Sequence, residues 1–170
     1  MKNIVSFIAI SLLLAACAST PQKETTQGTS AAAPAGQQQG LTQAQVDAQK
    51  LADELNTLKN KSVYFDFDQS IIKPEYTDVV QQQAAFVKAH GNDTVTLEGN
   101  CDERGSSEYN IALGQRRAYA VAKNLKLLGV SESQIKTISF GEEKPRATCH
   151  AEKCWKENRR VDFDHKISQQ

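Results

Sequence analysis

The sequence predicts an α/β two-layer sandwich, in which a mixed four-stranded sheet carries its helices on one face. Two observations lead to this class. Between residues 62 and 170, segments with apolar residues at every second position alternate with segments whose apolar residues recur three and four apart. Several strand segments also have one apolar and one polar face, so helices need to cover only one side of the sheet. The expected order is strand, helix, strand, helix, strand, loop, strand.

The first strand and the first helix are expected directly after residue 62. Val63, Phe65 and Phe67 alternate with polar residues, which is the pattern of a half-buried strand. Pro74 suits the first turn of a helix, because its fixed backbone angle and missing N–H are tolerated there. The apolar face that follows stops at the polar residues 90–93, where we expect the helix to end.

The second strand and the clearest helix of the chain come next. Val95 and Leu97 mark the strand, and a polar loop over residues 100–107 separates it from the helix. Ser107 is expected to cap the start of this helix and Gly129 to follow its end. The residues that recur three and four apart along it are Ile111, Gly114, Ala118, Val121, Leu125 and Leu128.

Two further strands complete the expected domain, which covers residues 62–170. Ile138 and Phe140 mark the third strand, and Val161 and Phe163 alternate with charged residues in the last one. A loop that contains two of the four cysteines separates these strands. A chain of this length is sufficient to bury one core of this kind.

The N-terminus has the pattern of an export signal over residues 1–16. Lys2 precedes an apolar run over residues 4–14, which is too short to span a bilayer and is typical of a signal peptide. The run ends in Leu-Ala-Ala-Cys, which resembles a bacterial lipobox. The resemblance implies that Cys17 receives a covalent lipid and becomes the first residue of the mature chain, and that Ala18 favours sorting to the outer membrane. An ordinary signal peptide with an incidental cysteine is the alternative.

An exported chain can form disulfides, and three cysteines remain besides Cys17. Cys149 and Cys154 could close a small loop and leave Cys101 free, although the sequence leaves other pairings open. A zinc site formed by Cys149, His150, Cys154 and His165 is the alternative, but their spacing matches no zinc motif. We therefore expect no metal, and no cofactor other than the lipid on Cys17.

Two segments are expected between the lipid and the domain. Residues 17–40 are rich in Ala, Gln, Thr, Ser, Gly and Pro, so they cannot bury enough surface to fold and are interpreted as a disordered tether. Residues 41–61 form a short helix or linker. Its narrow apolar stripe suits either a short coiled coil or a helix that lies against the domain or frays, and we favour the second. The stripe consists of Ala44, Ala48, Leu51, Leu55 and Leu58.

The charge balance argues against nucleic acid as a partner. The chain has 20 Lys and Arg residues and 20 Asp and Glu residues, which gives a formal net charge of zero. Proteins that bind duplex nucleic acid usually carry a basic excess on the binding face.

The loop before the second helix, together with that helix, holds the most informative polar residues. Asn110 and Arg117 lie seven residues apart and therefore share a helix face, and Asp102 precedes the helix. A nearby carboxylate and guanidinium can receive a zwitterion: Asp102 would bind an ammonium group, and Arg117 a carboxylate through a bidentate fork. A salt bridge that fixes the loop on the helix is the alternative. Gly114 lies between Asn110 and Arg117 and would let a ligand or a strand approach closely.

Five stretches together carry a family resemblance. They are VYFDFD at 63–68, EG at 98–99 with DERG at 102–105, EYNIALGQRRA at 108–118, GEEKP at 141–145 and NRR at 158–160. Residues 63–161 thereby resemble the OmpA-like peptidoglycan-binding domains, most closely those of the peptidoglycan-associated lipoproteins of the Tol–Pal system. The resemblance covers nearly the whole expected domain.

The resemblance implies a ligand, the meso-diaminopimelate of the peptidoglycan stem peptide. This residue carries an ammonium and a carboxylate on one carbon, which is the zwitterion that such a site can hold. By position, Asp102 is the acidic ligand residue and Arg117 the basic one. The resemblance adds Asp68, Arg104 and Asn110 as further contacts.

Two departures from the family pattern lie beside this expected site. Asn100 stands where many relatives have His, and Cys101 stands where they have Ala or Thr. Cys101 is therefore expected next to the ligand pocket, where it would change the pocket's shape. The arginines of Asn158-Arg159-Arg160 are expected to have a structural role, and contact with the ligand is the alternative.

The function that the resemblance implies is non-covalent tethering of the outer membrane to the cell wall. The domain would face the periplasm, anchored by lipid, and act in envelope integrity and cell division. Implied partners are peptidoglycan, TolB-like and other Tol proteins, and OmpA-type porins. The alternative is a periplasmic protein-interaction module that does not bind the wall. An enzyme is not expected, because no catalytic constellation accompanies the acidic residues Asp66, Asp68, Asp102 and Glu103.

Overall fold

The computed structural model describes residues 41–168. The expected export signal at 1–16, the lipid on Cys17 and the tether over 17–40 lie outside the described residues. Within 41–168 there is no helix with both the length and the apolar character needed to cross a membrane.

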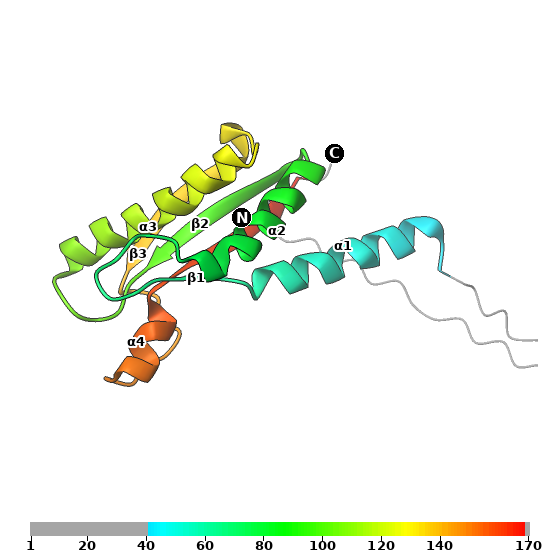
Figure 1. Ribbon diagram of the computed structural model, residues 1–170. Coiled ribbons are helices and arrows are strands. Elements are labelled where there is room, and N and C mark those ends of the chain that lie inside the picture. The colour runs from blue at the N-terminus through cyan, green and yellow to red at the C-terminus, as the bar shows by residue number, and fades with distance from the viewer. Residues whose placement is uncertain (1–40, 169–170) are drawn as a thin grey trace, which may run out of the picture. The chain divides into compact units, whose positions relative to one another are not determined.

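A four-stranded mixed sheet forms the centre of the domain (Figure 1). Its strands are β1 (Val63–Tyr64), β2 (Asp93–Asn100), β3 (Ile135–Gly141) and β4 (Arg160–Ile167). They lie in the order β1-β4-β2-β3. β4 runs antiparallel to both β1 and β2, whereas β2 and β3 are parallel. The last strand of the chain therefore lies inside the sheet, which brings residues near 160 next to the ends of β1 and β2.

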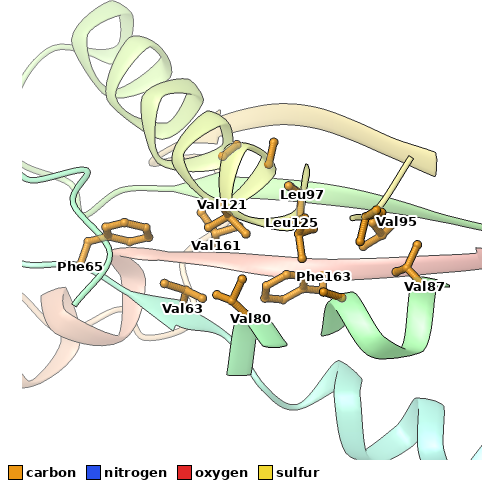
Figure 2. Close-up of a cluster of buried hydrophobic side chains, with 14 residues drawn as sticks. Val63, Phe65, Val80, Val87, Val95, Leu97, Val121, Leu125, Val161 and Phe163 are labelled. Carbon is orange, nitrogen blue, oxygen red and sulfur yellow. The ribbon is translucent and has the colours of Figure 1, made fainter. Parts of the chain in front are cut away.

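Two helices cover one face of this sheet, as predicted. They are α2 (Thr77–Ala89), which follows the 3-10 turn η1 (Pro74–Tyr76), and α3 (Ser107–Leu127). A second 3-10 turn, η2 (Glu132–Gln134), leads into β3. Figure 2 shows side chains of both helices packed against alternate residues of the strands. The core they form includes Val63, Phe65, Val80, Val87, Val95, Leu97, Val121, Leu125, Val161 and Phe163. Burial of this apolar surface is the main force that holds the sandwich together.

The first strand is shorter than the sequence predicts. β1 ends at Tyr64, and Phe67 is 56% exposed where a half-buried strand residue was expected. The reason is a turn: the backbone N–H of Gln69 donates to the Asp66 carbonyl, and Asp68 has a positive φ of 57°. The chain therefore leaves the sheet before Phe67, and an acidic residue occupies a left-handed conformation that Asp tolerates better than most residues.

The helix ends are nearly where they were predicted. Ser106, rather than Ser107, caps α3, because its hydroxyl accepts a hydrogen bond of 3.2 Å from the Tyr109 N–H. Gly129 follows the helix with φ +90°, the left-handed conformation expected of that position. The cysteine-containing loop also holds a short helix that was not predicted, α4 (Glu152–Asn158).

The N-terminal helix α1 (Gln43–Lys59) contacts the domain at its C-terminal end. Thr42 and Gln45 form a capping box at its start. Leu58 is buried, Leu51 and Leu55 are half-buried, and the alanines of the predicted stripe are exposed. The buried Gln83 amide donates a 3.0 Å hydrogen bond to the Leu58 carbonyl. This arrangement agrees with a helix that lies against the domain, with its one buried residue, Leu58, in the last turn.

Candidate ligand pocket

A pocket of about 180 Å³ opens where the segment after β1 meets the β2–α3 loop and the start of α3. It brings together all the residues that the sequence predicts for ligand binding. These are Asp68, Asp102, Arg104, Asn110 and Arg117, and the remaining lining residues are Phe67, Cys101, Gly105, Tyr109 and Leu113. The site residues thus come from three segments that the fold places at one end of the sheet.

Arg117 forms the inner wall of the pocket and is fully buried. Its Nε donates to the Gln69 carbonyl at 2.8 Å, and its Nη1 donates to the Asn100 carbonyl, also at 2.8 Å. Nη2 donates to the Asp66 carbonyl at 3.2 Å. Burial lowers the pKa of Arg117 below its usual value, because a charged group loses solvation inside the protein.

These main-chain contacts change the role expected of Arg117. All three guanidinium nitrogens already donate to carbonyl oxygens. A bidentate grip on a ligand carboxylate would require the guanidinium to give up some of these bonds. In the described arrangement, Arg117 joins the turn after β1 to the end of β2, and it supplies positive charge to the pocket from behind.

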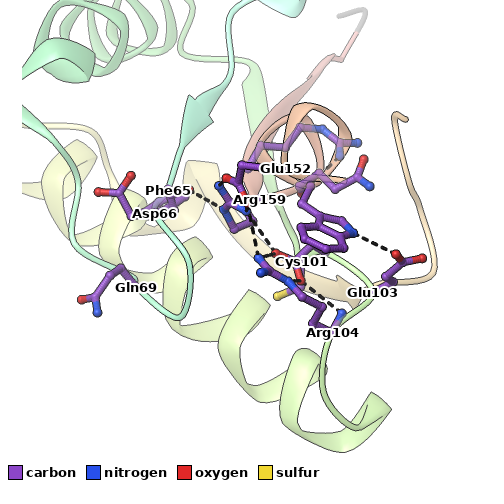
Figure 3. A network of polar contacts seen from close by, with 12 residues as sticks. Phe65, Asp66, Gln69, Cys101, Glu103, Arg104, Glu152 and Arg159 are labelled. Carbon is purple, nitrogen blue, oxygen red and sulfur yellow. Dashed lines mark hydrogen bonds and ion pairs between the residues drawn. The ribbon is translucent and has the colours of Figure 1, made fainter. Parts of the chain in front are cut away.

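Asp102 is buried and bound by two arginines, Arg104 and Arg159, which are labelled in Figure 3. The Arg104 guanidinium donates to Oδ1 at 3.1 Å and to Oδ2 at 2.7 Å, and the Arg104 backbone N–H donates to Oδ1 at 3.1 Å. Arg159 Nη1 donates to Oδ2 at 3.2 Å. Burial alone would raise the pKa of Asp102, but these hydrogen bonds outweigh it and lower the pKa below the usual value.

The expected alternative of a salt bridge between Asp102 and Arg117 has no counterpart among the ion pairs of residues 41–168. Asp102 pairs with Arg159 instead. It is buried, and its Nε also donates to the Phe65 carbonyl at 3.0 Å. The predicted structural role of this arginine therefore includes a direct bond to the acidic residue of the pocket. Sequence reasoning did not assign that bond, because it joins residues 57 positions apart.

The outer rim of the pocket is more accessible. Asp68 is exposed, and the Tyr109 hydroxyl donates a hydrogen bond to its carboxylate. Asn110 is buried, and its amide donates to the carbonyls of Asp102 and Arg104 at 3.3 and 3.2 Å, which fixes the loop on α3. Tyr109 was not predicted as a site residue, although it lies in the EYNIALGQRRA stretch that carries the family resemblance.

Cys101 lies in the pocket wall, as predicted, and is buried and free. Its thiol donates to the Asn110 carbonyl at 3.3 Å. Burial raises the pKa of this thiol to about 11, so it stays protonated at neutral pH and is a poor nucleophile. Cys101 therefore shapes the pocket without adding reactive chemistry to it.

The structure decides between the two roles that the sequence left open for Gly114, which were close approach of a ligand and close approach of a strand. A Cβ built on Gly114 would collide with the Ser139 hydroxyl, and one built on Gly99 would collide with the Gly114 carbonyl. The missing side chain therefore admits strands β2 and β3 against α3 rather than a ligand. This close contact sets how deeply α3 sits on the sheet beside the pocket.

The residues considered for zinc are used in other ways. The structure joins Cys149 and Cys154 in a disulfide with the Cα atoms 5.5 Å apart. His165 Nδ1 lies 2.7 Å from a carboxylate oxygen of the buried Asp93, and its Nε2 lies 2.8 Å from the Gln83 amide oxygen. In the described part of the chain, no group of three or more His, Cys, Asp or Glu residues is arranged to hold a metal ion.

Comparison with known proteins agrees with this architecture. Residues 64–159 match the OmpA family. The peptidoglycan-associated lipoprotein of Pseudomonas aeruginosa is 38% identical over 166 residues, which cover 96% of this chain and 98% of that protein. The protein of the same description from Pasteurella multocida is 40% identical over 164 residues, which cover 95% and 97% of the two chains.

Solved structures of related proteins also share this architecture. The crystal structure of the peptidoglycan-associated lipoprotein from Burkholderia pseudomallei is 47% identical with a TM-score of 0.62, covering 63% of this chain and 91% of that one. The C-terminal domain of Helicobacter pylori MotB shares the fold at 20% identity and a TM-score of 0.59, over 64% of this chain and 85% of that one. The chain belongs to the OmpA family and, within it, to the peptidoglycan-associated lipoproteins.

Proposed function

We propose that this protein binds the meso-diaminopimelate of peptidoglycan stem peptides in the pocket formed by the segment after β1, the β2–α3 loop and the start of α3, and so tethers the outer membrane to the cell wall. The observation that carries the proposal is the pocket itself, which gathers both carboxylates and both arginines expected from the sequence around one small opening. The relatives are named peptidoglycan-associated lipoproteins, which supports the same ligand class.

The chemistry of the lining suits a zwitterion. Asp68 is the exposed carboxylate, so a ligand ammonium meets it first. Asp102 already accepts four hydrogen bonds from Arg104 and Arg159, so an ammonium reaches it by replacing one of them. The positive charge of Arg104 and Arg117 attracts the carboxylate of the ligand. Phe67 and Leu113 provide apolar contact for the carbon chain between the charged ends.

Tethering requires a second attachment at the other end of the chain. We assign this to the lipid on Cys17, with the domain in the periplasm and residues 17–40 as the tether. Several acyl chains add about 0.8 kcal/mol for each buried methylene group, so the anchor is stable. Many copies bound to one wall gain affinity through avidity even if each contact is weak.

The cellular role follows from the family. We assign the protein to the Tol–Pal system, with TolB-like and other Tol proteins as partners in envelope integrity and cell division. Contact with OmpA-type porins belongs to the same proposal. Binding rather than catalysis is the activity that the pocket supports.

Sedimentation with purified peptidoglycan tests the proposal directly, using the full chain solubilised in detergent. The variants are Asp68→Asn, Asp102→Ala and Arg117→Ala, and Lys123→Ala serves as the control because Lys123 is an exposed residue of α3 outside the pocket lining. We expect wild type and Lys123→Ala to sediment with the wall. Asp68→Asn should bind about tenfold more weakly, since one charged hydrogen bond is lost.

The Asp68→Asn variant keeps the test independent of folding. Asp102 and Arg117 are buried, so their alanine variants must also be shown to unfold cooperatively, whereas Asp68 is exposed. Equal binding by wild type and all three variants would refute the pocket as the wall-binding site. Absence of binding by wild type would favour the alternative of a protein-interaction module.

A further inference from the structure

The segment of residues 149–158, here called the α4 segment, lies against the pocket loop without lining the pocket. It contains the helix α4 and the disulfide between Cys149 and Cys154. α4 has 7 residues, and Ala151 at its start provides no side-chain cap. So short a helix is not stable alone in water, because nucleation costs more than a few hydrogen bonds return. The disulfide, the contacts with the pocket loop and the hydrogen bonds of Asn158 with Arg146 and Ala147 therefore hold the segment in place.

Trp155, the only tryptophan of the chain, contacts the pocket loop from the α4 segment, as do His150 and Glu152. Its indole N–H donates a 2.8 Å hydrogen bond to the Glu103 carboxylate, which Figure 3 shows as a dashed line. His150 Nδ1 lies 2.7 Å from the same carboxylate. The Trp155 bond, followed by the His150 bond, lowers the pKa of Glu103 below its usual value. Glu103 is thus held from the α4 side between two pocket residues, Asp102 and Arg104.

Arg104 is enclosed by two aromatic rings. Its guanidinium carbon lies 4.0 Å from the ring centroid of Phe67 and 4.1 Å from that of Trp155. Such stacking orients a planar guanidinium and contributes cation–π attraction. In this orientation the Nε and Nη2 atoms of Arg104 both donate to Asp102, so the two aromatic rings favour the geometry that pairs the charges of the pocket.

We propose that Trp155, held by the disulfide-closed α4 segment, is a positioning residue for the pocket, which fixes Arg104 against Asp102 and thereby sets the arrangement of charge that the ligand meets. This deepens the proposed function and rests on it. Trp155 acts through Arg104 and Glu103, because it is absent from the lining itself. Without the indole, one face of the Arg104 guanidinium is open to water, and its side chain gains freedom to leave Asp102.

Calorimetric titration of the full chain in detergent with a soluble stem peptide that carries meso-diaminopimelate tests the inference. We expect Trp155→Ala to bind about tenfold more weakly, because the stack and the Glu103 bond are both lost. Trp155→Phe keeps a ring over Arg104 but has no N–H, so its affinity should lie between the two. The double variant Cys149→Ser/Cys154→Ser should also weaken binding. Lys153→Ala is the matched control, since this exposed α4 residue contacts neither Glu103 nor Arg104.

A second measurement separates positioning from general stability. Amide hydrogen exchange of residues 101–105 should be faster in Trp155→Ala, while exchange in the centres of β2 and β4 stays as in wild type. If wild type binds and Trp155→Ala binds equally well with unchanged exchange, the inference is wrong and the proposed function stands. If wild type does not bind at all, the proposed function fails, and the exchange experiment alone decides whether Trp155 orders the loop.

Discussion

Arg117 shows how a single side chain can serve both the fold and the pocket. It is the largest of the fully buried side chains, and its guanidinium donates to the carbonyls of Gln69, Asn100 and Asp66. These carbonyls belong to the turn after β1 and the end of β2, two segments that are far apart in the sequence. A buried charge is tolerated here because polar groups surround it on several sides.

We therefore expect Arg117→Lys to destabilise the protein although the charge is kept. A lysine ammonium is a compact point charge that cannot reach carbonyls on several sides, so the substitution should cost roughly 3 kcal/mol of unfolding free energy. Urea denaturation measures this, with Arg116→Lys as the control on the exposed neighbouring position. An unfolding free energy equal to that of wild type would contradict the role given to the main-chain contacts.

Asp102 should make stability depend on pH at the acidic end. Its pKa in the folded protein is lowered from the ordinary value of 3.8, so its ionised form stabilises the fold above that value. The contribution is lost as the pH falls through the lowered pKa. We expect the difference in unfolding free energy between wild type and Asp102→Asn to be large near neutral pH and to shrink below 3.8. A difference that does not change with pH would show that the arginine contacts do not depend on the charge.

At the scale of elements, the contact of α3 with the sheet depends on two glycines. Gly99 on β2 and Gly114 on α3 approach so closely that a Cβ on Gly99 would collide with the Gly114 carbonyl. Backbone atoms cannot move aside as a flexible side chain does. The depth at which α3 sits, and with it the position of Asn110 and Arg117, therefore depends on the absence of a methyl group.

Gly99→Ala should consequently lower the unfolding free energy by about 3 kcal/mol, since overpacking of a rigid contact forces the backbone to shift. Gly91→Ala is the matched control, because nothing lies within 4 Å of a Cβ added there, and its effect should stay within about 0.5 kcal/mol. Thermal unfolding followed by circular dichroism compares the two. Similar melting temperatures for both variants would mean that the helix can lift from the sheet at little cost.

For the molecule as a whole, the sequence predicts the fold better than it predicts the contacts between segments. The alternation of apolar and polar residues in β2 and the three-and-four spacing of apolar residues in α3 each reflect the burial of their own segment. Each element could therefore be predicted from its own residues. Phe67 continued the alternation of β1 but lies outside the sheet, because the turn at Asp68 depends on contacts with α3 that no local pattern encodes.

The pocket likewise combines residues that the sequence predicts with contacts that it does not predict. Four of its five predicted residues came from stretches in the loop and α3, the fifth, Asp68, came from the stretch at 63–68, and the structure places all five in one lining. The bonds of Arg159 to Asp102 and of Trp155 to Glu103 were not predicted, because each joins residues more than fifty positions apart. α4 was not predicted, because its 7 residues are too few to show a helical period.

The most direct test of the central claim is a comparison of two soluble stem peptides in calorimetric titrations of the full chain. One peptide carries meso-diaminopimelate, and the other carries L-lysine, which has the same ammonium but lacks the second carboxylate. A pocket that binds the zwitterion should bind the lysine peptide at least about tenfold more weakly, because the positive charges of Arg104 and Arg117 then have no ligand carboxylate to attract. Equal affinity for the two peptides would contradict the account.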